Sequence, residues 1–195
     1  MGDTRSEDYA AQLQRREGAR WKRLLNVQAP YRWNLRRLDL GFALDVGCGI
    51  GRNLAGLDGV GVDHNSTAVE LARQRGFTAF TTEDFVRSEY AVAERFDSIL
   101  LAHVVEHMTG AEARELLANY LRYLRAGGRV VLIAPQEAGF RSDQTHVEFM
   151  DHSALRALLE ANGLQVVREY SFPLVRAAGR FLRYNEFVSV GRAQL

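Results

Sequence analysis

The stretch Phe42–Gly51, which reads Phe-Ala-Leu-Asp-Val-Gly-Cys-Gly-Ile-Gly, decides the fold of this chain. Its first five residues are mostly apolar, as is typical of a strand buried on both faces of a parallel sheet. Glycines then follow at every second position. Because glycine has no Cβ and adopts positive φ, a ligand can approach this main chain closely. A helix that begins after the glycines would point its free N–H groups at the same ligand, so the stretch predicts a nucleotide-like cofactor.

An acidic residue ends the next predicted strand, which covers residues 60–63. This residue is Asp63, eighteen positions after Asp45. A carboxylate in that place can accept hydrogen bonds from two adjacent ribose hydroxyls. The alternative interpretation is a structural glycine turn followed by an aspartate that caps a helix.

The spacing of the glycines separates two families of nucleotide-binding folds. Dinucleotide-binding domains use G-x-G-x-x-G, whereas Asp45–Gly51 reads D-x-G-x-G-x-G. With Asp63 in place, this pattern resembles the class I S-adenosylmethionine-dependent methyltransferases, over about 42–192. The resemblance implies an α/β fold with a Rossmann-like, seven-stranded, mostly parallel sheet, helices on both faces and an antiparallel last strand. It also implies an N-terminal helical segment over 1–40 that covers the cofactor site and a methyltransferase domain over 41–195.

The resemblance further implies that S-adenosylmethionine is the cofactor and which residues bind it. Asp84, after the third strand, would accept a hydrogen bond from the adenine amino group, and Phe85 would flank the ring. The predicted cofactor-binding residues are Asp45, Gly47, Cys48, Gly49, Asn53, Asp63, His64, Asp84, Phe85, Ala102 and His103.

The remaining strands are predicted from short apolar runs between turn residues. These runs cover residues 77–80, 97–102, 130–133, 164–170 and 186–190. Two helices are predicted before the first strand. One carries Trp21, Leu24 and Leu25 on one face, and the other has Pro30 in its first turn. The residues that share one side of the second are Tyr31, Asn34, Leu35 and Leu38. The sequence leaves two roles open for these helices: they either cover the cofactor or only pack against the rest of the protein.

Helix start signals follow several of the strands. Thr67 with Glu70 and Thr109 with Glu112 match the capping box, and Ser153 is a candidate N-cap. The helix after Thr109 carries an apolar stripe that should face the core and is expected to end at Gly127–Gly128. The stripe consists of Ala113, Leu116, Leu117, Tyr120, Leu121 and Leu124.

A competing motif lies at His103–His107, which also matches H-x-x-E-H, the inverted zinc-protease signature. That interpretation requires both histidines on one sustained helix. A buried strand directly precedes the motif, and a new helix cap follows two residues later. The sequence therefore favours a site without metal.

Three histidines lie near the predicted cofactor edge, namely His103, His107 and His146. A neutral oxygen or nitrogen acceptor must lose a proton on methylation, and histidine is suited to take it. Asp143 and His146 match a D-x-x-H run that many relatives of this fold carry beside the acceptor pocket. His146 is therefore the predicted base, with Asp143 and His107 as further catalytic candidates. A purely structural role, in which Asp143 and His146 pin their loop, is the alternative.

Composition and charge describe an ordinary globular chain. The net charge is +1, with 47% apolar residues, which gives no reason to expect nucleic-acid binding. The single Cys48 suits a reducing compartment. No apolar run is long enough to span a bilayer, and the start is too charged for a signal peptide. The expected localisation is cytoplasmic, without integral membrane association.

The segment Phe172–Arg183 interleaves apolar side chains with arginines. In one interpretation the segment forms an apolar, basic surface that suits a lipid-linked or anionic acceptor. In the other, its aromatic side chains pack on the last strands and its arginines are solvated.

The function predicted from the sequence is methyl transfer to an oxygen or nitrogen atom of a small-molecule or lipid- or sugar-linked acceptor. A non-catalytic S-adenosylmethionine-binding regulator or partner subunit is the second hypothesis. A nicotinamide oxidoreductase is disfavoured by the glycine spacing and by the acids at 63 and 84. The acceptor and the oligomeric state do not follow from the sequence.

Overall fold

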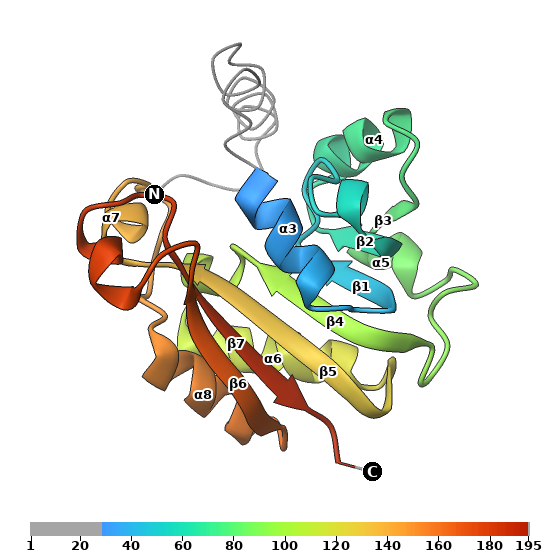
Figure 1. The fold of residues 1–195 in the computed structure, drawn as a ribbon. Coiled ribbons are helices and arrows are strands. Elements are labelled where there is room, and N and C mark those ends of the chain that lie inside the picture. The colour runs from blue at the N-terminus through green and yellow to red at the C-terminus, as the bar shows by residue number, and fades with distance from the viewer. Residues whose placement is uncertain (1–28, 195) are drawn as a thin grey trace.

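A computed structural model describes residues 29–194 and shows one mixed sheet with helices packed around it (Figure 1). The strand order is β3-β2-β1-β4-β5-β7-β6. The strands are β1 Phe42–Val46, β2 Asp58–Asp63, β3 Ala79–Thr81, β4 Phe96–Ala102, β5 Leu124–Pro135, β6 Gln165–Phe172 and β7 Glu186–Arg192. The pairs from β3 to β5 are parallel, and β7 is antiparallel to both β5 and β6. The predicted fold class is confirmed.

The α-helices are α3 Ala29–Arg37, α4 Ser66–Gln74, α5 Thr82–Phe85, α6 Gly110–Leu121, α7 Glu137–Phe140 and α8 His152–Ala161. Residues 29–194 also contain three short 3-10 helices in the connections after β1, β4 and β6, namely η1 Leu54–Gly56, η2 Val105–His107 and η3 Arg176–Arg180. The helix predicted around Trp21, Leu24 and Leu25 lies outside the described residues. Among residues 29–194, no helix combines the length and the apolar character that a membrane span requires.

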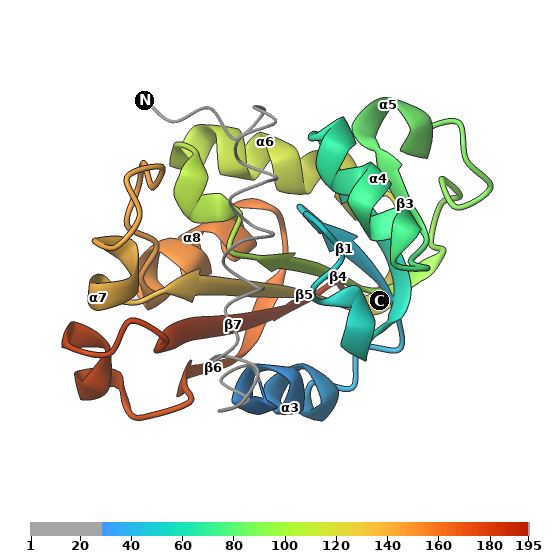
Figure 2. The same cartoon turned by 90° about the horizontal axis from the view of Figure 1, so that it is seen from above.

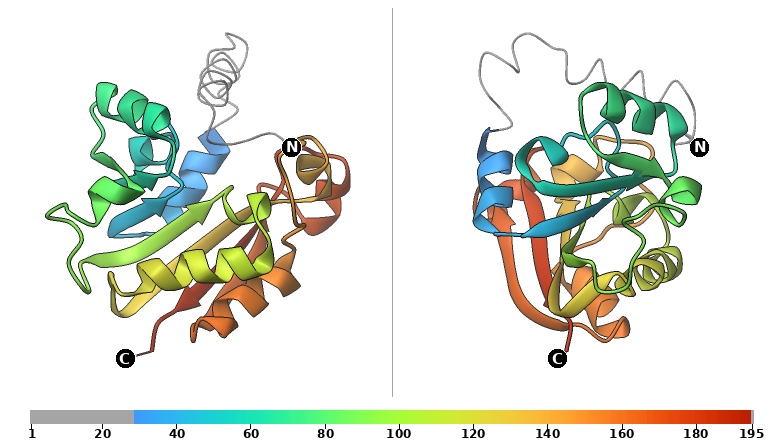
Figure 3. Two further views of the ribbon diagram at one scale, coloured as in Figure 1. Left: turned by 180° about the vertical axis from the view of Figure 1, so that it is seen from behind. Right: turned by 90° about the vertical axis from the view of Figure 1, so that its right-hand side faces the viewer.

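The two faces of the sheet are covered by different helices, as the turned views show (Figures 2 and 3). One face packs against α3 and the turn after it, where Leu35 and Leu38 belong to one core cluster with side chains of β1, β4, β5, β6 and β7. The other packs against α6 and α8. Alternate residues of β4 divide between the faces, with Ile99 and Leu101 on one side and Leu100 on the other. This period of two is expected of a strand buried on both sides.

Pro30 lies in the first turn of α3, where its missing N–H costs no helix hydrogen bond. Of the residues predicted to share a side, Asn34, Leu35 and Leu38 are buried, and Tyr31 is half-buried. This helix prediction is confirmed.

The capping box at Thr109 is confirmed, because the Thr109 N–H donates to Glu112 Oε2 and the Glu112 N–H donates to Thr109 Oγ1. The other two predicted caps are wrong. Asn65 caps α4 by accepting from the Ala68 N–H at 3.0 Å, and Asp151 caps α8 by accepting from the Ala154 N–H at 3.0 Å. In both cases another strong capping side chain lies two residues before the predicted one and accepts the N–H three residues further on, so the helix begins earlier.

The predicted end of the helix after Thr109 is also wrong. This helix ends at Leu121, and Gly127–Gly128 lie inside β5, which begins at Leu124. Strand pairing explains the difference, because Leu124 lies opposite Phe96 of β4. Leu124 is buried in the same core as the α6 stripe, so its apolar character extends the helical pattern past the real end of the helix.

Candidate functional site

The carboxyl ends of β1, β2, β4 and β5 point to one edge of the sheet because these strands are parallel. Since β7 runs the other way, its first residue, Glu186, lies opposite Pro135 at that same edge. Ligands of open α/β sheets bind at this edge. The loops after these strands carry most of the predicted site residues.

The loop after β1 has the backbone that its glycines allow. Gly47, Gly49 and Gly51 have φ of 78°, 53° and 81°, values that favour glycine. A Cβ at Gly47 would collide with the Val104 side chain after β4. The glycine loop and the loop after β4 therefore lie against each other, with only glycine permitting the approach.

Asp63 joins the glycine loop to the end of β2. Its Oδ2 accepts the Gly49 N–H at 2.7 Å, and its Oδ1 accepts the Asn65 N–H at 2.8 Å. The carboxylate is thus held by two main-chain groups, and each oxygen keeps a second lone pair for a ligand hydroxyl. His64, predicted beside it, is exposed, with its Nδ1 3.7 Å from Asp63 Oδ1.

Asp45 is fully buried at the base of the loop. Its Oδ1 accepts from Asn53 Nδ2 at 3.1 Å, and Asn53 Oδ1 accepts from the Tyr31 hydroxyl at 3.0 Å. Its Oδ2 has no hydrogen-bond partner among the described residues. Burial raises the pKa of Asp45 to about 7, and the Asn53 hydrogen bond opposes this rise. An orphaned buried acceptor beside a glycine loop fits a cofactor that brings N–H donors.

Cys48 lies in the same loop but is buried, and its side chain fills the space beside Gly61. Burial raises the pKa of its thiol far above the usual range, which keeps the group neutral and unreactive. The structure thus gives the Cys48 side chain a packing role.

The two residues predicted for adenine lie in different environments. Asp84, in α5, has a half-exposed side chain with Oδ2 3.7 Å from Arg73 Nη2. Phe85 is fully buried, with its ring among Phe96 and Tyr123 of the core. A ring without exposed surface cannot flank a ligand in this conformation, so the structure does not support the predicted Phe85 contact.

At the end of β4, the buried Ala102 leads into His103, which adopts a positive φ of 60°. The His103 Nε2 atom lies 2.8 Å from Glu186 Oε1, and its Nδ1 lies 3.3 Å from Glu106 Oε1. Burial lowers the pKa of His103, but the two carboxylates outweigh it and raise the pKa to about 9. His103 is therefore a cation between two acids.

His107 and His146, far apart in sequence, lie together with ring centroids 4.8 Å apart. The Nδ1 of His107 is 3.2 Å from the Thr145 carbonyl oxygen, and the Nδ1 of His146 is 2.7 Å from the Phe140 carbonyl oxygen. Since carbonyl oxygens only accept, both Nδ1 atoms carry protons, and in the neutral form of each ring Nε2 has the lone pair. Burial lowers the pKa of His107, which favours its neutral form.

Asp143 supports this pair through Thr145. Its Oδ1 accepts from the Thr145 N–H at 3.1 Å and from the Thr145 hydroxyl at 2.8 Å. Because the hydroxyl proton points to Asp143, Thr145 Oγ1 is free to accept from His107 Nδ1 at 3.1 Å. Asp143 therefore orients the Thr145–His107 side of the pair.

The H-x-x-E-H run does not lie on one helix. His103 directly follows β4 and contacts Glu186, and only Val105–His107 form the short η2. A different set of residues meets instead, because one potential ligand atom each of Glu106, His107 and His146 lies within 4.8 Å of the others.

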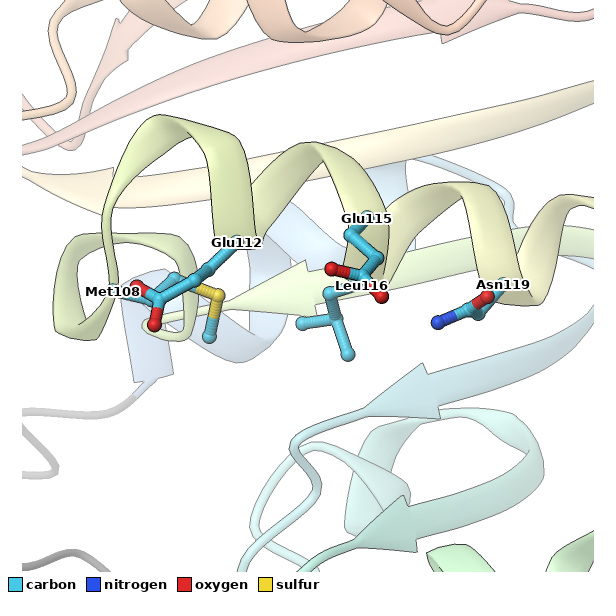
Figure 4. A pocket seen from close by; sticks show the side chains of 5 residues that line it. All are labelled: Met108, Glu112, Glu115, Leu116 and Asn119. Carbon is cyan, nitrogen blue, oxygen red and sulfur yellow. The ribbon is translucent and has the colours of Figure 1, made fainter.

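A separate open depression of about 310 Å³ runs along α6 (Figure 4). Met108, Glu112, Glu115, Leu116 and Asn119 line it. Glu112 already serves the helix cap, and neither histidine of the pair lies in the lining. The depression is therefore not the candidate site.

Sequence reasoning missed the contributions of Glu186 and Thr145. Glu186 lies 83 positions after His103 and reaches it only because β7 is antiparallel. No pattern among neighbouring residues in the sequence indicates such a contact. The sequence leaves the role of Tyr31 open between cofactor cover and ordinary packing, and its hydrogen bond to Asn53 ties α3 directly to the glycine loop.

Comparisons with known proteins agree with this geometry. A family model described as a methyltransferase domain matches residues 9–169. No curated protein matches the chain.

Three solved structures illustrate the likeness of the fold. A chain of the complex between the Haloferax volcanii Trm112 methyltransferase activator and a methyltransferase has a TM-score of 0.71 and 18% identity, covering 99% of this chain and 98% of its own. The N-methyltransferase NodS from Bradyrhizobium japonicum has a TM-score of 0.63 and 19% identity, covering 85% and 95%. Magnesium protoporphyrin IX methyltransferase from Synechocystis with bound SAH has a TM-score of 0.60 and 17% identity, covering 86% and 85%.

At these identities the solved structures establish the fold, whereas the family model matches more than half of the chain. The D-x-G-x-G-x-G loop and Asp63 lie at the edge where this fold binds its ligands. The chain therefore belongs to the methyltransferase-domain family, the class I S-adenosylmethionine-dependent methyltransferases that its glycine motif resembles.

Proposed function

We propose that this protein is an enzyme that transfers a methyl group from S-adenosylmethionine to an oxygen or nitrogen atom of a small-molecule or lipid- or sugar-linked acceptor. The proposal rests on one observation: the residues that would bind the cofactor and the histidines on the acceptor side lie next to each other at one edge of the sheet. The cofactor group runs from Asp45 through Asn53 to Tyr31. The Tyr31 ring lies 6.2 Å from the His103 ring, which leads to the histidine side.

S-adenosylmethionine is the cofactor of this family, and the residues present fit it. The Asp63 lone pairs suit ribose hydroxyls, and the unpartnered Asp45 Oδ2 suits an N–H donor. When bound, the cofactor supplies an electrophilic methyl group on a sulfonium. The protein gains chiefly by positioning the two reactants, a contribution of up to ~7–11 kcal/mol in favourable cases.

The acceptor side is proposed at the His107–His146 pair. His146 has a protonated Nδ1 held by the Phe140 carbonyl, so its Nε2 is available to take a proton from the acceptor. His107 and Asp143 are proposed to position this group through Thr145. The 1–40 segment is proposed to cover the cofactor, which the hydrogen bond from Tyr31 to Asn53 supports.

A second candidate is a non-catalytic S-adenosylmethionine-binding regulator or partner subunit. This candidate is motivated by the structural similarity to a chain from a complex with a methyltransferase activator, because that chain works with a partner protein. A partner would add to the site rather than replace it, because the cofactor residues are assembled within this chain.

The test is turnover with methyl-labelled S-adenosylmethionine and an extract of metabolites and lipids from cells that express the protein. We expect label in an extracted compound and release of the demethylated cofactor. His146→Ala should lower turnover by about 10²–10⁴, as loss of a general base does, with little change in cofactor affinity. His152→Ala, which changes a histidine outside the pair, is the matched control. Cofactor binding without turnover, with cellular proteins also present, would favour the regulator.

A further inference from the structure

We propose that Glu106, His107 and His146 form a binding site for a divalent first-row transition-metal ion of the Zn²⁺ type on the acceptor side. The three residues come from η2 and from the loop that follows β5, and one potential ligand atom of each lies within 4.8 Å of the others. A donor set of two imidazoles and one carboxylate binds such ions in preference to Mg²⁺ or Ca²⁺.

Glu106 provides the strongest argument for a ligand. Its side chain is fully buried, and neither carboxylate oxygen accepts a hydrogen bond from any part of the chain that the structure describes. The nearest cation, His103, has its Nδ1 3.3 Å from Oε1 without hydrogen-bond alignment, while its Nε2 is committed to Glu186. Glu106 thus has a charged neighbour at Oε1 but no aligned donor, and Oε2 has no partner among the described residues, so the buried carboxylate is only partly compensated. A bound cation would satisfy it.

Both histidines are prepared as ligands by their neighbours. His107 Nδ1 faces two acceptors on Thr145, and His146 Nδ1 faces the Phe140 carbonyl. Histidines that bind metal through Nε2 usually donate Nδ1–H in this way, which fixes the tautomer and the orientation of the ring. The hydrogen bond from the Thr145 hydroxyl to Asp143 completes the support on the His107 side.

The separation of the ligand atoms requires a contraction. In the tetrahedral geometry that Zn²⁺ prefers, bonds of about 2.0–2.2 Å place two ligand atoms ~3.3–3.6 Å apart, so a pair at the 4.8 Å limit must approach by about 1.2–1.5 Å. Rotation of the Glu106 carboxylate and of the two rings about their Nδ1 hydrogen bonds would supply this movement. Three protein ligands leave a position on the ion open, which is typical of catalytic rather than structural sites.

This inference revises the sequence-based expectation of a site without metal. That expectation concerned His103 and His107 on one helix face, whereas the present set replaces His103 with His146. Metal binding itself does not depend on methyl transfer. The consequence of metal binding for catalysis rests on the proposed function. A hydroxyl group of the acceptor, bound at the open position of the ion, has a lowered pKa and loses its proton more readily. His146 would then act as a ligand rather than as the base, and the proton of the bound hydroxyl would pass to solvent water.

The test uses the full chain, purified without a histidine tag and treated with chelator. Calorimetry and elemental analysis with ZnCl₂ should give about one ion per chain, while MgCl₂ at the same concentration should give none. Glu106→Gln and His146→Ala should each weaken Zn²⁺ binding by more than ~10-fold, because loss of outer supports alone costs 10–100-fold. His152→Ala, whose ring lies beside Phe187 and Ser189 outside the cluster, should bind like the native protein.

Binding of S-adenosylmethionine, measured in the same preparations, reports whether each variant is folded. Absence of stoichiometric Zn²⁺ in a preparation that binds the cofactor would overturn the inference. Equal Zn²⁺ affinity in Glu106→Gln, His146→Ala and the native protein would also overturn it. Neither result tests the proposed methyl transfer, which is measured separately by the transfer of labelled methyl groups.

Discussion

The main-chain N–H of Gly49 donates a hydrogen bond to the carboxylate of Asp63 across 2.7 Å. This bond ties the turn after β1 to the end of β2, the two segments that the sequence pattern marks as cofactor-binding. Asp63 is therefore a brace for the loop as well as a proposed ribose ligand. The two roles are compatible because each carboxylate oxygen accepts two hydrogen bonds.

Asp63→Ala should weaken S-adenosylmethionine binding by about 10- to 100-fold. Hydrogen bonds to a charged group contribute ~1.5–3 kcal/mol, which corresponds to that range. Calorimetry measures the loss, and Asp58→Ala is the matched control because Asp58 is exposed at the opposite end of β2. Unchanged affinity in Asp63→Ala would remove the ribose assignment, and tight binding of a nicotinamide dinucleotide to the native chain would contradict the family's cofactor.

Asp45→Asn should stabilise the ligand-free protein at pH 8 more than at pH 5. The pKa of Asp45 is raised from 3.8 to about 7, so the unfolded chain ionises first. The native state therefore loses stability as pH rises from about 4 to about 7 and then changes no further. The amide carries no such penalty, and the expected gain at pH 8 is about 1–4 kcal/mol at 1.36 kcal/mol per pKa unit.

Urea unfolding at the two pH values measures this gain, with Asp58→Asn as the control for an exposed aspartate. The same Asp45→Asn protein should bind S-adenosylmethionine more weakly, because its Nδ2 replaces the unpartnered acceptor Oδ2. A variant that gains no stability at pH 8 relative to pH 5 would show that burial does not raise the pKa of Asp45.

Helix α3 should become protected from hydrogen exchange when the cofactor binds. The Tyr31 hydroxyl donates to Asn53, and Asn53 donates to Asp45, so ordering of the glycine loop should extend to residues 31–34. Exchange measured by mass spectrometry should slow there and stay unchanged in α8. Tyr31→Phe should reduce the protection. Identical exchange with and without cofactor would leave α3 as plain scaffold.

The segment 172–183 should bind anionic vesicles weakly at low salt. Phe172 is buried and Arg176 pairs with Glu137 at 2.8 Å, yet Phe181 is 85% exposed and Val175 is 76% exposed. Exposed apolar side chains among arginines suit an anionic lipid surface. Sedimentation should show binding that falls with salt and in Phe181→Ser.

Val92→Ser is the matched control for this experiment, because Val92 is exposed in the loop before β4. Pelleting that Phe181→Ser leaves intact, or that is equal on neutral vesicles, would contradict a role for the segment. Failure to pellet at any salt would favour solvated arginines over a lipid contact.

Most of the fold was predictable because its signals are local. The glycine spacing after β1, the Thr109–Glu112 cap and the apolar runs of the strands each act over a few residues. The errors occurred where two local signals competed. Asn65 and Asp151 replaced the predicted caps, and Leu124 continued a helical pattern although it pairs with Phe96 in the sheet.

The sequence by itself determined the family, the cofactor edge and the candidates His107 and His146, since these depend on residue types at fixed spacing along the chain. Only the tertiary structure decided which of these groups meet and in what environment. It buried Phe85 in the core, left Asp45 Oδ2 without a partner, and placed Glu186 on His103 across 83 positions. It also brought Glu106 to the two histidines. The physical reason is that burial and contact between distant segments arise from the packing of the sheet and its loops, which no short stretch of sequence encodes.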